Sequence, residues 1–461
     1  MKFETVVKGG TVVNAGGSVV ADVGIDGETI TALGRHLEGA EVVDATGRYV
    51  FPGGIDAHVH FQLPFGGTVS ADDFENGTKA AACGGVTTII DFAMQTRGDS
   101  LEKAVADRRA EADGKVSVDY GLHGAITDWN ENTAREMRRL AENGVPTFKM
   151  FMIYRNEGWI SSDADLFQAL EIAGETGAQI GVHAESAEIL DFLIARTARD
   201  PDVTSLGAVA HAKSRPPVVE WEAVQRALAW AEATGGRLYV VHTSTARAAA
   251  LIARARDRGV NALCETCPQY LLLDESVFER EDGHLFATCP QIKTKEDAAA
   301  LWRGLASGGV HVLATDTCTF TTEQKALWKG DFRKIPFGVP GVETFLPLTY
   351  AAGPAAGRLT LERWVALVSE NPARIFGLYP QKGVVQPGAD ADIVVWNPDR
   401  GGEIRAADLQ TNCDWNPFEG FALAGKPERT FCRGKEVARD GRFTGKPGYG
   451  RFVERKTGGG L

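Results

Sequence analysis

Short apolar runs alternate with longer helical patterns through the middle of the chain. The runs that predict strands cover residues 54–60, 86–91, 117–125, 147–151, 179–183, 238–242, 262–264 and 311–315. The clearest helical patterns between them cover residues 100–112, 134–143, 163–176, 217–234 and 246–259. Such alternation is typical of βα units around a parallel sheet. Eight units over about 320 residues predict an α/β fold, a TIM-like (β/α)8 barrel with insertions, the largest over residues 62–78 and 317–341.

Both ends of the chain have a different pattern, in which short strands are broken by turns. The N-terminal strands are expected at residues 5–7, 11–13, 21–25, 29–33, 41–43 and 49–51, and the C-terminal ones at 392–396, 428–433 and 435–439. Asp26-Gly27 is a hairpin signal. Because an isolated hairpin is marginally stable in water, we expect the two ends to pair into one small β domain.

Composition narrows the class of protein. A chain of 461 residues with 44% hydrophobic residues can bury a large core. The net charge is -12 and the sequence has no long basic run. Both features argue against nucleic acid or an anionic membrane as a partner and favour a small substrate. Neither a signal peptide nor a membrane span is visible, so we expect a cytoplasmic protein. Seven scattered cysteines indicate reduced thiols, and Cys264 and Cys267 form a lone CxxC that we interpret as structural.

Nitrogen and oxygen ligands for metals lie at the ends of the predicted barrel strands. Residues two apart on a strand face the same side, so the imidazoles of His58 and His60 can reach one ion. The C-terminal strand ends of a barrel meet at one mouth. We therefore expect a shared site from His58 and His60 on the first strand, Lys149 on the fourth, His183 on the fifth, His242 on the sixth and Asp316 after the eighth.

Lys149 lies within the apolar run Thr147-Phe-Lys-Met-Phe151, where a buried ammonium needs a partner or a function. Burial lowers the pKa of a lysine and favours the neutral amine, which reacts with carbon dioxide to form a carbamate. Four histidines and one aspartate overfill one catalytic ion, but two ions bridged by this carbamate leave room for water. The donor set favours Zn²⁺ and tolerates Mn²⁺, Co²⁺, iron or Ni²⁺.

Each of these residues also has a structural interpretation. A single histidine at a strand end often only caps or packs, Asp316 can cap a helix, and Lys149 can extend to solvent. Their joint occurrence favours the metal site. The remaining histidines are interpreted as structural: His36, His123, His211, His284 and His311.

Several long motifs resemble the hydantoinase and dihydropyrimidinase family of cyclic amidohydrolases almost from end to end. They are Phe51-Pro-Gly-Gly-Ile-Asp-Ala-His-Val-His60, Phe148-Lys-Met-Phe-Met-Ile-Tyr154, Val182-His-Ala-Glu185, Val240-Val-His242, Glu265-Thr-Cys-Pro-Gln-Tyr270, the block 371–383, Gly388-Ala-Asp-Ala-Asp392 and Gly445-Lys-Pro-Gly-Tyr-Gly450. The resemblance implies a TIM barrel over residues 53–377, a β-sandwich from residues 1–52 and 378–461, a carbamylated lysine between two metals, and a homotetramer or dimer.

The resemblance also assigns roles by position. It implies that His58, His60 and Asp316 hold one metal, that His183 and His242 hold the second, and that Lys149 holds both. Tyr154 matches a tyrosine that steadies the oxyanion. Thr288 and Cys289 fall where relatives hold the ring imide through the main chain of a Ser or Thr, and Phe337 falls where many have Asn. Gln291-Ile-Lys293 replaces the more usual Pro-Leu-Arg.

The predicted reaction is hydrolytic opening of a cyclic ureide or imide to an N-carbamoyl amino acid. Asp316 would accept a proton from water and return it to the leaving ring nitrogen, while Tyr154 would donate a hydrogen bond to the oxyanion. The apolar residues Leu63, Phe65 and Trp159 are expected to contact an aromatic or alkyl substituent of the ring. The alternative is that they pack on each other or on a neighbouring subunit.

Three other functions stay open on the sequence. A dihydroorotase or allantoinase would use a related metal site, and dihydroorotate would require a basic residue such as Lys293 or Arg155 for its carboxylate. A deaminase-type aminohydrolase usually has one metal and needs no lysine on the fourth strand. A catalytically silent scaffold would have lost metal ligands, whereas this chain retains all of them.

Overall fold

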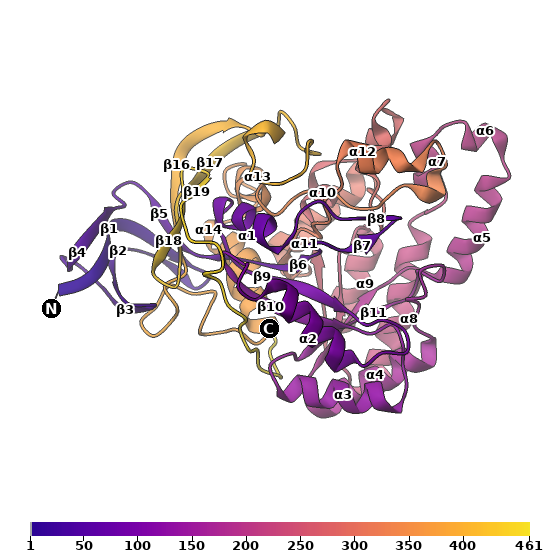
Figure 1. Cartoon of the computed structure of the whole chain (residues 1–461), viewed down its shortest axis with the longest axis horizontal. Helices are drawn as coiled ribbons and strands as arrows, with labels where there is room; N and C mark the ends of the chain where they lie inside the picture. The colour runs from indigo at the N-terminus through magenta and orange to yellow at the C-terminus, as the bar shows by residue number, and fades with distance from the viewer. Residues whose placement is uncertain (1) are drawn as a thin grey trace.

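The computed structural model describes residues 2–461, and eight parallel strands form a barrel in its larger part (Figure 1). In sheet order they are β6 (Gly54–Val59), β9 (Val86–Met94), β10 (Asp119–Ala125), β11 (Thr147–Phe151), β12 (Gln179–His183), β13 (Leu238–Val240), β14 (Ala262–Thr266) and β15 (Val312–Leu313). The His60 N–H donates to the Thr317 carbonyl at 2.8 Å and joins the first strand to the segment after the eighth. All eight predicted strands are confirmed, although β13 and β15 are shorter than predicted.

Helices surround the barrel and connect successive strands. They are α1 (Phe74–Cys83), α2 (Leu101–Ala112), α3 (Glu131–Glu142), α4 (Asp163–Thr176), α8 (Val218–Thr234), α9 (Ala246–Asp257), α11 (Lys295–Ser307), α13 (Phe345–Ala352), α14 (Leu361–Val365), the π-helical turn η5 (Ala366–Glu370) and α15 (Asn371–Ile375). The predicted helices are confirmed. Ser100 caps α2 by accepting from the Lys103 N–H, and Gly144 and Gly259 have φ of +88° and +90°, which glycine adopts after a helix at little cost.

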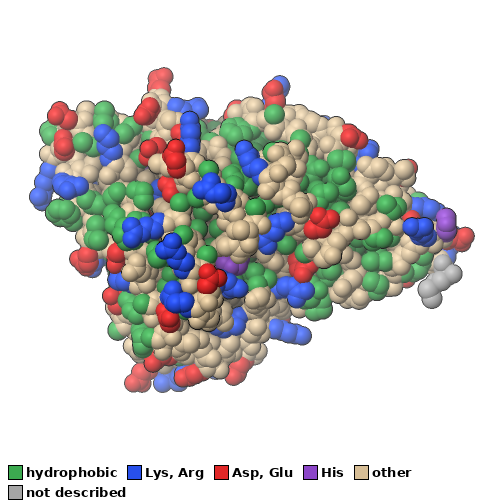
Figure 2. All heavy atoms as spheres, turned by 180° about the vertical axis from the view of Figure 1, so that it is seen from behind, with side chains coloured by type: hydrophobic (Ala, Val, Ile, Leu, Met, Phe, Trp, Pro, Cys, Tyr) green, Lys and Arg blue, Asp and Glu red, His purple; other side chains and the backbone are tan. Residues whose placement is uncertain are grey.

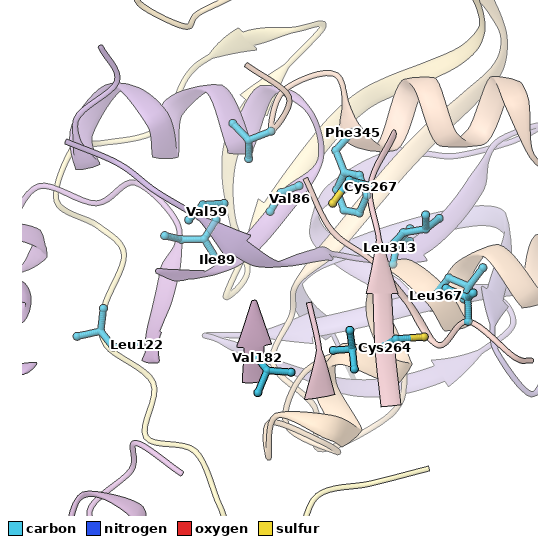
Figure 3. Close-up of a cluster of buried hydrophobic side chains, with 14 of the residues drawn as sticks. Val59, Val86, Ile89, Leu122, Val182, Cys264, Cys267, Leu313, Phe345 and Leu367 are labelled. Atoms are coloured by element: carbon cyan, nitrogen blue, oxygen red, sulfur yellow. The ribbon is translucent and has the colours of Figure 1, made fainter. Parts of the chain in front are cut away.

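The main core lies between the barrel strands and the helices. Val59, Ile89, Leu122, Val182 and Cys264 come from five different strands and belong to one buried apolar cluster (Figure 3). Phe345 of α13 and Leu367 of η5 complete it from the helical layer. Because alternate strand residues face outward, this packing leaves the other set of side chains for the barrel interior.

Insertions enlarge the end of the barrel at which the strands finish. The predicted insertion after β6 contains the hairpin β7 (Pro64–Phe65) and β8 (Thr68–Val69), and the one after β15 contains α12 (Thr322–Lys325), η3 (Ala326–Trp328) and η4 (Phe332–Lys334). Two further insertions were not predicted. One comprises α5 (Ala187–Ala198), α6 (Pro201–Thr204) and α7 (Ala208–Lys213), and the other α10 (Pro268–Leu272), η1 (Glu275–Glu279) and η2 (Gly283–Phe286).

The two ends of the chain share one nine-stranded sheet, as predicted. It consists of β1 (Lys2–Asn14), β2 (Gly17–Asp26), β3 (Thr29–Gly34), β4 (Glu38–Asp44), β5 (Tyr49–Pro52), β16 (Ile393–Glu403), β17 (Ala422–Cys432), β18 (Lys435–Arg439) and β19 (Arg442–Phe443). Antiparallel pairing of β5 with β16 joins the termini. The two strands predicted at residues 5–7 and 11–13 are one strand, β1, because a bulge between Val7 and Gly10 carries it past the turn-like glycines.

Buried charges attach this sheet to the barrel. The Lys382 ammonium donates to Asp392 at 2.7 Å and to Asp119 of barrel strand β10 at 2.8 Å. Arg433 also donates to Asp119, at 3.1 Å. A buried ammonium and guanidinium thus neutralise carboxylates from both parts of the molecule, which fixes the orientation of the β domain on the barrel.

The last residues of the chain return to the barrel and close the end opposite the strand termini, which we call the barrel floor. The Val453 N–H donates to the Tyr120 carbonyl at 2.8 Å, and the Val453 side chain packs with Ile90 and Phe376 inside the barrel. The Arg455 guanidinium donates to Thr147 Oγ1 at 2.8 Å, at the start of the strand that carries Lys149. The end of the barrel opposite the strand termini is therefore filled by the chain itself.

Surface and cysteines agree with the compositional expectations. Side chains of both charge signs are interspersed on the face in Figure 2. No helix within residues 2–461 is long and apolar enough to cross a membrane. All seven cysteines are buried and unpaired, including Cys264 and Cys267.

The barrel floor gives a first prediction. Val453→Ala should lower the free energy of unfolding by about 1–3 kcal/mol, because it leaves a cavity in a closed apolar interior. Val19→Ala is the matched control, since Val19 is 54% exposed against 5% for Val453. Urea denaturation of both variants measures the difference, and equal stabilities would contradict the proposed closure of the floor.

Candidate active site at the carboxyl ends of the strands

A cavity of about 60 Å³ opens where the barrel strands end. The lining includes every predicted site residue except Thr288, namely His58, His60, Leu63, Phe65, Lys149, Tyr154, Trp159, His183, His242, Cys289, Asp316 and Phe337. The barrel therefore brings side chains from distant parts of the chain to one cavity, as the strand-end argument predicts.

His58, His60 and Asp316 form the first of two potential ligand groups. Nε2 of His58 lies 3.2 Å from Asp316 Oδ1, and Nε2 of His60 lies 3.3 Å from the same oxygen. Nδ1 of His58 bonds to Glu265, so this carboxylate fixes the ring and leaves Nε2 directed at the cavity. Within residues 2–461, His58 Nε2 has no hydrogen-bond partner despite being buried. Such an unsatisfied nitrogen beside a carboxylate suits a cation.

His183 and His242 form the second group, with ring centroids 4.5 Å apart. Nε2 of His183 lies 2.9 Å from Glu185 Oε2, which leaves Nδ1 as the remaining ligand atom. Nδ1 of His242 has no hydrogen-bond partner among residues 2–461. Burial lowers the pKa of both imidazoles, and burial also lowers the pKa of His58 far below its usual value. These rings are therefore neutral at physiological pH, as metal ligation requires.

Lys149 lies in the same cavity and is 3% exposed. Its ammonium forms no ion pair with any residue from 2 to 461, and its Nζ lies 5.3 Å from the centre of the Phe92 ring. Burial lowers the Lys149 pKa to about 8. A substantial fraction of the amine is thus neutral near physiological pH, the form that attacks carbon dioxide.

Asp316 differs from the neutral groups around it. Burial alone would raise its pKa, but attraction to the adjacent His58, the hydrogen bond with His60 and the positive charge of Lys149 outweigh that effect and hold the pKa below its usual value. The carboxylate is therefore ionised at neutral pH. Its φ is +55°, and the φ angles of His242 and Tyr154 are +35° and +68°. Left-handed backbone at three non-glycine residues is strained and is common at functional sites, where it directs side chains into a cavity.

A third possible ligand group, of His183, Glu185 and Cys289, is less suited to a cation. Its ligand atoms lie within 4.8 Å of one another. However, Arg215 Nη1 lies 3.4 Å from Glu185 Oε2 and 3.2 Å from Cys289 Sγ. This guanidinium already neutralises the carboxylate and would repel a metal ion, so we interpret Glu185 and Arg215 as supports of His183.

One wall of the cavity, next to His183, contains Tyr154, Cys289 and Phe337. Burial raises the Tyr154 pKa well above its usual value, so the phenol stays protonated and can donate. The Phe337 ring packs on His211 at 4.8 Å and on Phe65 at 6.2 Å. Within residues 2–461, neither main-chain polar group of Cys289 nor the N–H of Phe337 has a main-chain hydrogen-bond partner.

Thr288 does not line the cavity. Its Oγ1 donates to the Pro290 carbonyl at 2.8 Å, and its own carbonyl accepts from Nε2 of His211 at 3.0 Å. Cys289, the next residue, takes the cavity position and donates its S–H to Glu185 at 3.1 Å. Of the two neighbours, only Cys289 therefore lines the cavity and can offer its main chain to a ligand there.

The apolar residues above the cavity pack on each other as well as line it. The Phe65 ring lies 5.7 Å from Trp159 and 5.8 Å from Tyr154, while Leu63 packs with Cys318 and Phe320. Arg155 lies outside this lining, paired with Glu188 at 2.6 Å, and Lys293 bonds to Gln291. Neither basic residue faces the cavity, which disfavours a substrate whose carboxylate must be bound by one of them.

Four supporting residues had no predicted role: Glu185, Arg215, Glu265 and Lys325. Glu265 accepts from the Tyr239 hydroxyl at 2.9 Å and from the His242 N–H at 3.1 Å in addition to contacting His58. A charged residue in an apolar strand was the signal that identified Lys149, and Glu265 within Ala262–Thr266 carries the same signal.

The role of Glu265 gives a second prediction. Glu265→Gln should weaken metal binding by about 10- to 100-fold, because a neutral amide makes His58 less basic and holds its ring less firmly. Glu343→Gln is the control, since Glu343 is a buried carboxyl outside this cavity. Competition with a chelator measures the affinity, and equal affinity in the two variants would contradict the assigned support of His58.

Comparisons with known proteins were made on the whole chain. Residues 49–437 match the Amidohydrolase family. The chain is 42% identical to a D-hydantoinase of Geobacillus stearothermophilus over 99% of its own length and 97% of the relative, and 40% identical to a D-hydantoinase of Streptomyces coelicolor over 99% of each. The crystal structure of a dihydropyrimidinase from Brevibacillus agri superposes with a TM-score of 0.96 at 40% identity, covering 98% of this chain and 99% of the other.

Proposed function

The chain belongs to the amidohydrolase family, and on that premise we propose that it is a metal-dependent hydrolase that opens hydantoin or dihydropyrimidine rings to N-carbamoyl amino acids. The observation that carries this proposal is the single cavity that contains four imidazoles, Lys149 and Asp316. Relatives named as hydantoinase or dihydropyrimidinase match nearly the whole chain and add independent support.

The donor set fits two divalent cations. We assign His58, His60 and Asp316 to one ion, His183 and His242 to the other, and carbamylated Lys149 to both, with zinc as the favoured metal. The buried nitrogens of His58 and His242 that lack a partner support this assignment. When bound, two such cations supply Lewis acidity, which polarises a carbonyl group and lowers the pKa of water.

Carbamylation supplies the missing shared anion. The neutral Lys149 amine forms a bond to the carbon of carbon dioxide and releases one proton, so a neutral side chain becomes an anionic one; starting from the ammonium, two protons are released. The apolar surroundings favour this change, because they disfavour the isolated ammonium and hold the pKa near 8. Together with Asp316, the carboxylate among the described residues that line the cavity, this carbamate would supply the negative charge that two cations require.

Asp316 and Tyr154 carry the proton transfers and hydrogen bonding of the reaction. Asp316 is ionised and accepts the proton of the attacking water, then returns it to the ring nitrogen as the carbon–nitrogen bond breaks. Tyr154 keeps its proton and donates to the oxygen of the attacked carbonyl, an effect of about 3 kcal/mol in comparable sites.

Main-chain groups of Cys289 and Phe337 hold the ring. Their free N–H and C=O groups match the alternating acceptors and donors of a cyclic imide. Because these contacts are made by the main chain, replacement of a Ser or Thr side chain by Cys289 preserves them. The Phe337 ring fills space where many relatives have a smaller polar group and makes this wall apolar.

Leu63, Phe65 and Trp159, which we call the lid, determine the preferred substituent of the ring. The cavity measures only about 60 Å³ with the lid side chains packed together, so a larger ring substituent must insert among the aromatic rings. We therefore propose a preference for aromatic or alkyl groups at ring position 5. A cytoplasmic homotetramer or dimer stays a prediction from the sequence.

Dihydroorotase activity is not favoured, since the described lining has no Arg and no Lys besides Lys149 for the carboxylate of dihydroorotate. Allantoinase activity is not favoured, since the relatives are named as hydantoinases and a dihydropyrimidinase. A silent scaffold is disfavoured because no metal-ligand position is lost.

A substrate panel tests the function. Hydantoin, 5-phenylhydantoin, 5-benzylhydantoin, dihydrouracil and dihydroorotate should be compared by kcat/KM, with chiral analysis of the products. We expect ring opening, with the two substituted hydantoins preferred because their groups bury apolar surface against the lid. No turnover of any ring would refute the function, whereas preference for the unsubstituted rings would refute only the role of the lid.

The bridging role of Lys149 gives a further prediction. Lys149→Ala should lower bound metal from about two ions per chain to less than one and abolish turnover, because the shared anion is lost. Added short-chain carboxylic acids should restore part of both by supplying a carboxylate in the vacated space. Elemental analysis and ring-opening assays measure the two effects. Full turnover of the variant without added acid would contradict the assignment.

A further inference from the structure

Two loops that are distant in sequence form the ring-binding wall. One contains Ala287 to Cys289, and the other, within the insertion after β15, contains Pro336 to Gly338. The Gly338 N–H donates to the Ala287 carbonyl at 3.0 Å and is their direct main-chain contact. The relative position of Cys289 and Phe337 depends on how firmly these loops are joined.

Lys325, the last residue of α12, joins the same two loops. Its ammonium donates to the Pro336 carbonyl at 2.7 Å and to the Ala287 carbonyl at 3.1 Å. Pro336 directly precedes Phe337, and Ala287 lies two residues before Cys289. One side chain therefore holds the main chain on both sides of the wall, next to each residue whose main chain is free for a ligand.

The environment of Lys325 is unusual for a lysine. The side chain is fully buried, its neighbours include the rings of Phe320 and Trp415, and it forms no ion pair with any residue from 2 to 461. Burial lowers its pKa to about 7. Both the ammonium and the neutral amine have at least two N–H groups, so either form can satisfy both carbonyls.

A lysine buried without a counter-ion destabilises a fold, and an apolar side chain would serve packing better. Among residues 2–461, the side-chain hydrogen bonds of Lys325 go only to the two wall loops. This selectivity indicates a role in the wall and not in the general stability of the barrel.

His211 of α7 supports the opposite side of the same wall. Its Nε2 contacts the Thr288 carbonyl at 3.0 Å, and its ring packs against Phe337 at 4.8 Å. Burial lowers its pKa well below the usual value, so the ring is neutral. The wall is thus fixed from two sides by residues that do not line the cavity.

We propose that Lys325 is a positioning residue, which holds the main chains of Cys289 and Phe337 at the separation that a cyclic imide requires. This inference rests on the proposed function for the identity of the ligand. Because the wall is ordered before the substrate arrives, binding does not have to order two loops. Loss of Lys325 should therefore weaken ring binding more than it slows the chemistry, which occurs at Asp316 and Tyr154.

The kinetic test compares three variants with the unchanged enzyme, all loaded with zinc and assayed with hydantoin. Lys325→Met keeps the length of the side chain and removes both donors, and it should raise KM about tenfold while kcat changes less than about threefold. Lys325→Gln keeps two N–H donors on a shorter chain and should recover part of the KM. Val453→Ala, which lowers stability far from the wall, should leave KM unchanged.

Metal content separates this inference from the metal assignment, because Lys325→Met should bind as much zinc as the unchanged enzyme. Unchanged KM in Lys325→Met, or a loss confined to kcat, would overturn the inference while leaving the ring-opening function intact. Absence of ring opening by the unchanged enzyme would instead refute the proposed function.

A measurement on the unchanged enzyme does not depend on whether the variants fold. Hydrogen–deuterium exchange should show that peptides covering residues 286–290 and 335–339 are protected without substrate and gain little protection when hydantoin is added. Rapid exchange of both peptides in the free enzyme would show that the wall forms only on binding and would overturn the role of Lys325.

Discussion

The site depends on one physical constraint, the burial of basic nitrogens without enough anions to balance them. Burial keeps the imidazoles of His58, His183 and His242 neutral and lowers the Lys149 pKa to about 8, while Asp316 stays ionised beside two of the imidazoles. Neutral nitrogens with free lone pairs bind cations, and a neutral amine can become a carbamate. Burial disfavours protonation of these nitrogens and therefore leaves their lone pairs free to bind metal ions.

Supporting residues turn this constraint into a defined geometry. Glu265 fixes His58 from one side of the barrel, and Glu185, itself neutralised by Arg215, fixes His183 from another. Lys325 and His211 bond in the same way to the loops that carry Cys289 and Phe337. In each case a buried side chain outside the cavity forms a hydrogen bond with a residue that lines the cavity or lies next to it. The fold therefore determines how that residue is oriented.

The β sheet and the C-terminal segment complete the barrel on the sides away from the cavity. The β sheet from both termini lies beside the barrel (Figure 1) and is attached to it through Lys382, Asp119 and Asp392. The C-terminal segment inserts Val453 and Arg455 into the floor. Arg455 contacts Thr147, two residues before Lys149 on the same strand. Closure at this end leaves the strand termini as the open side, where residues that follow β6, β11, β14 and β15 line the cavity.

Cys289 and Phe337 were named only through the family resemblance, whereas the eight barrel strands, the pairing of the two ends and the six candidate metal ligands were predicted from the residue pattern. These follow from local periodicity and from the rule that parallel strands end at one mouth, which places His58, His183 and Asp316 together without coordinates. Only the tertiary structure decided that Cys289 and not Thr288 faces the cavity, that residues 187–213 form a helical insertion, and that Glu185, Glu265 and Lys325 support the site. Glu265, a charged residue within an apolar strand, carried a local signal, but that signal did not identify its partner. The support of the site depends on which side chains meet across strands and loops far apart in the chain, and no local pattern records such contacts.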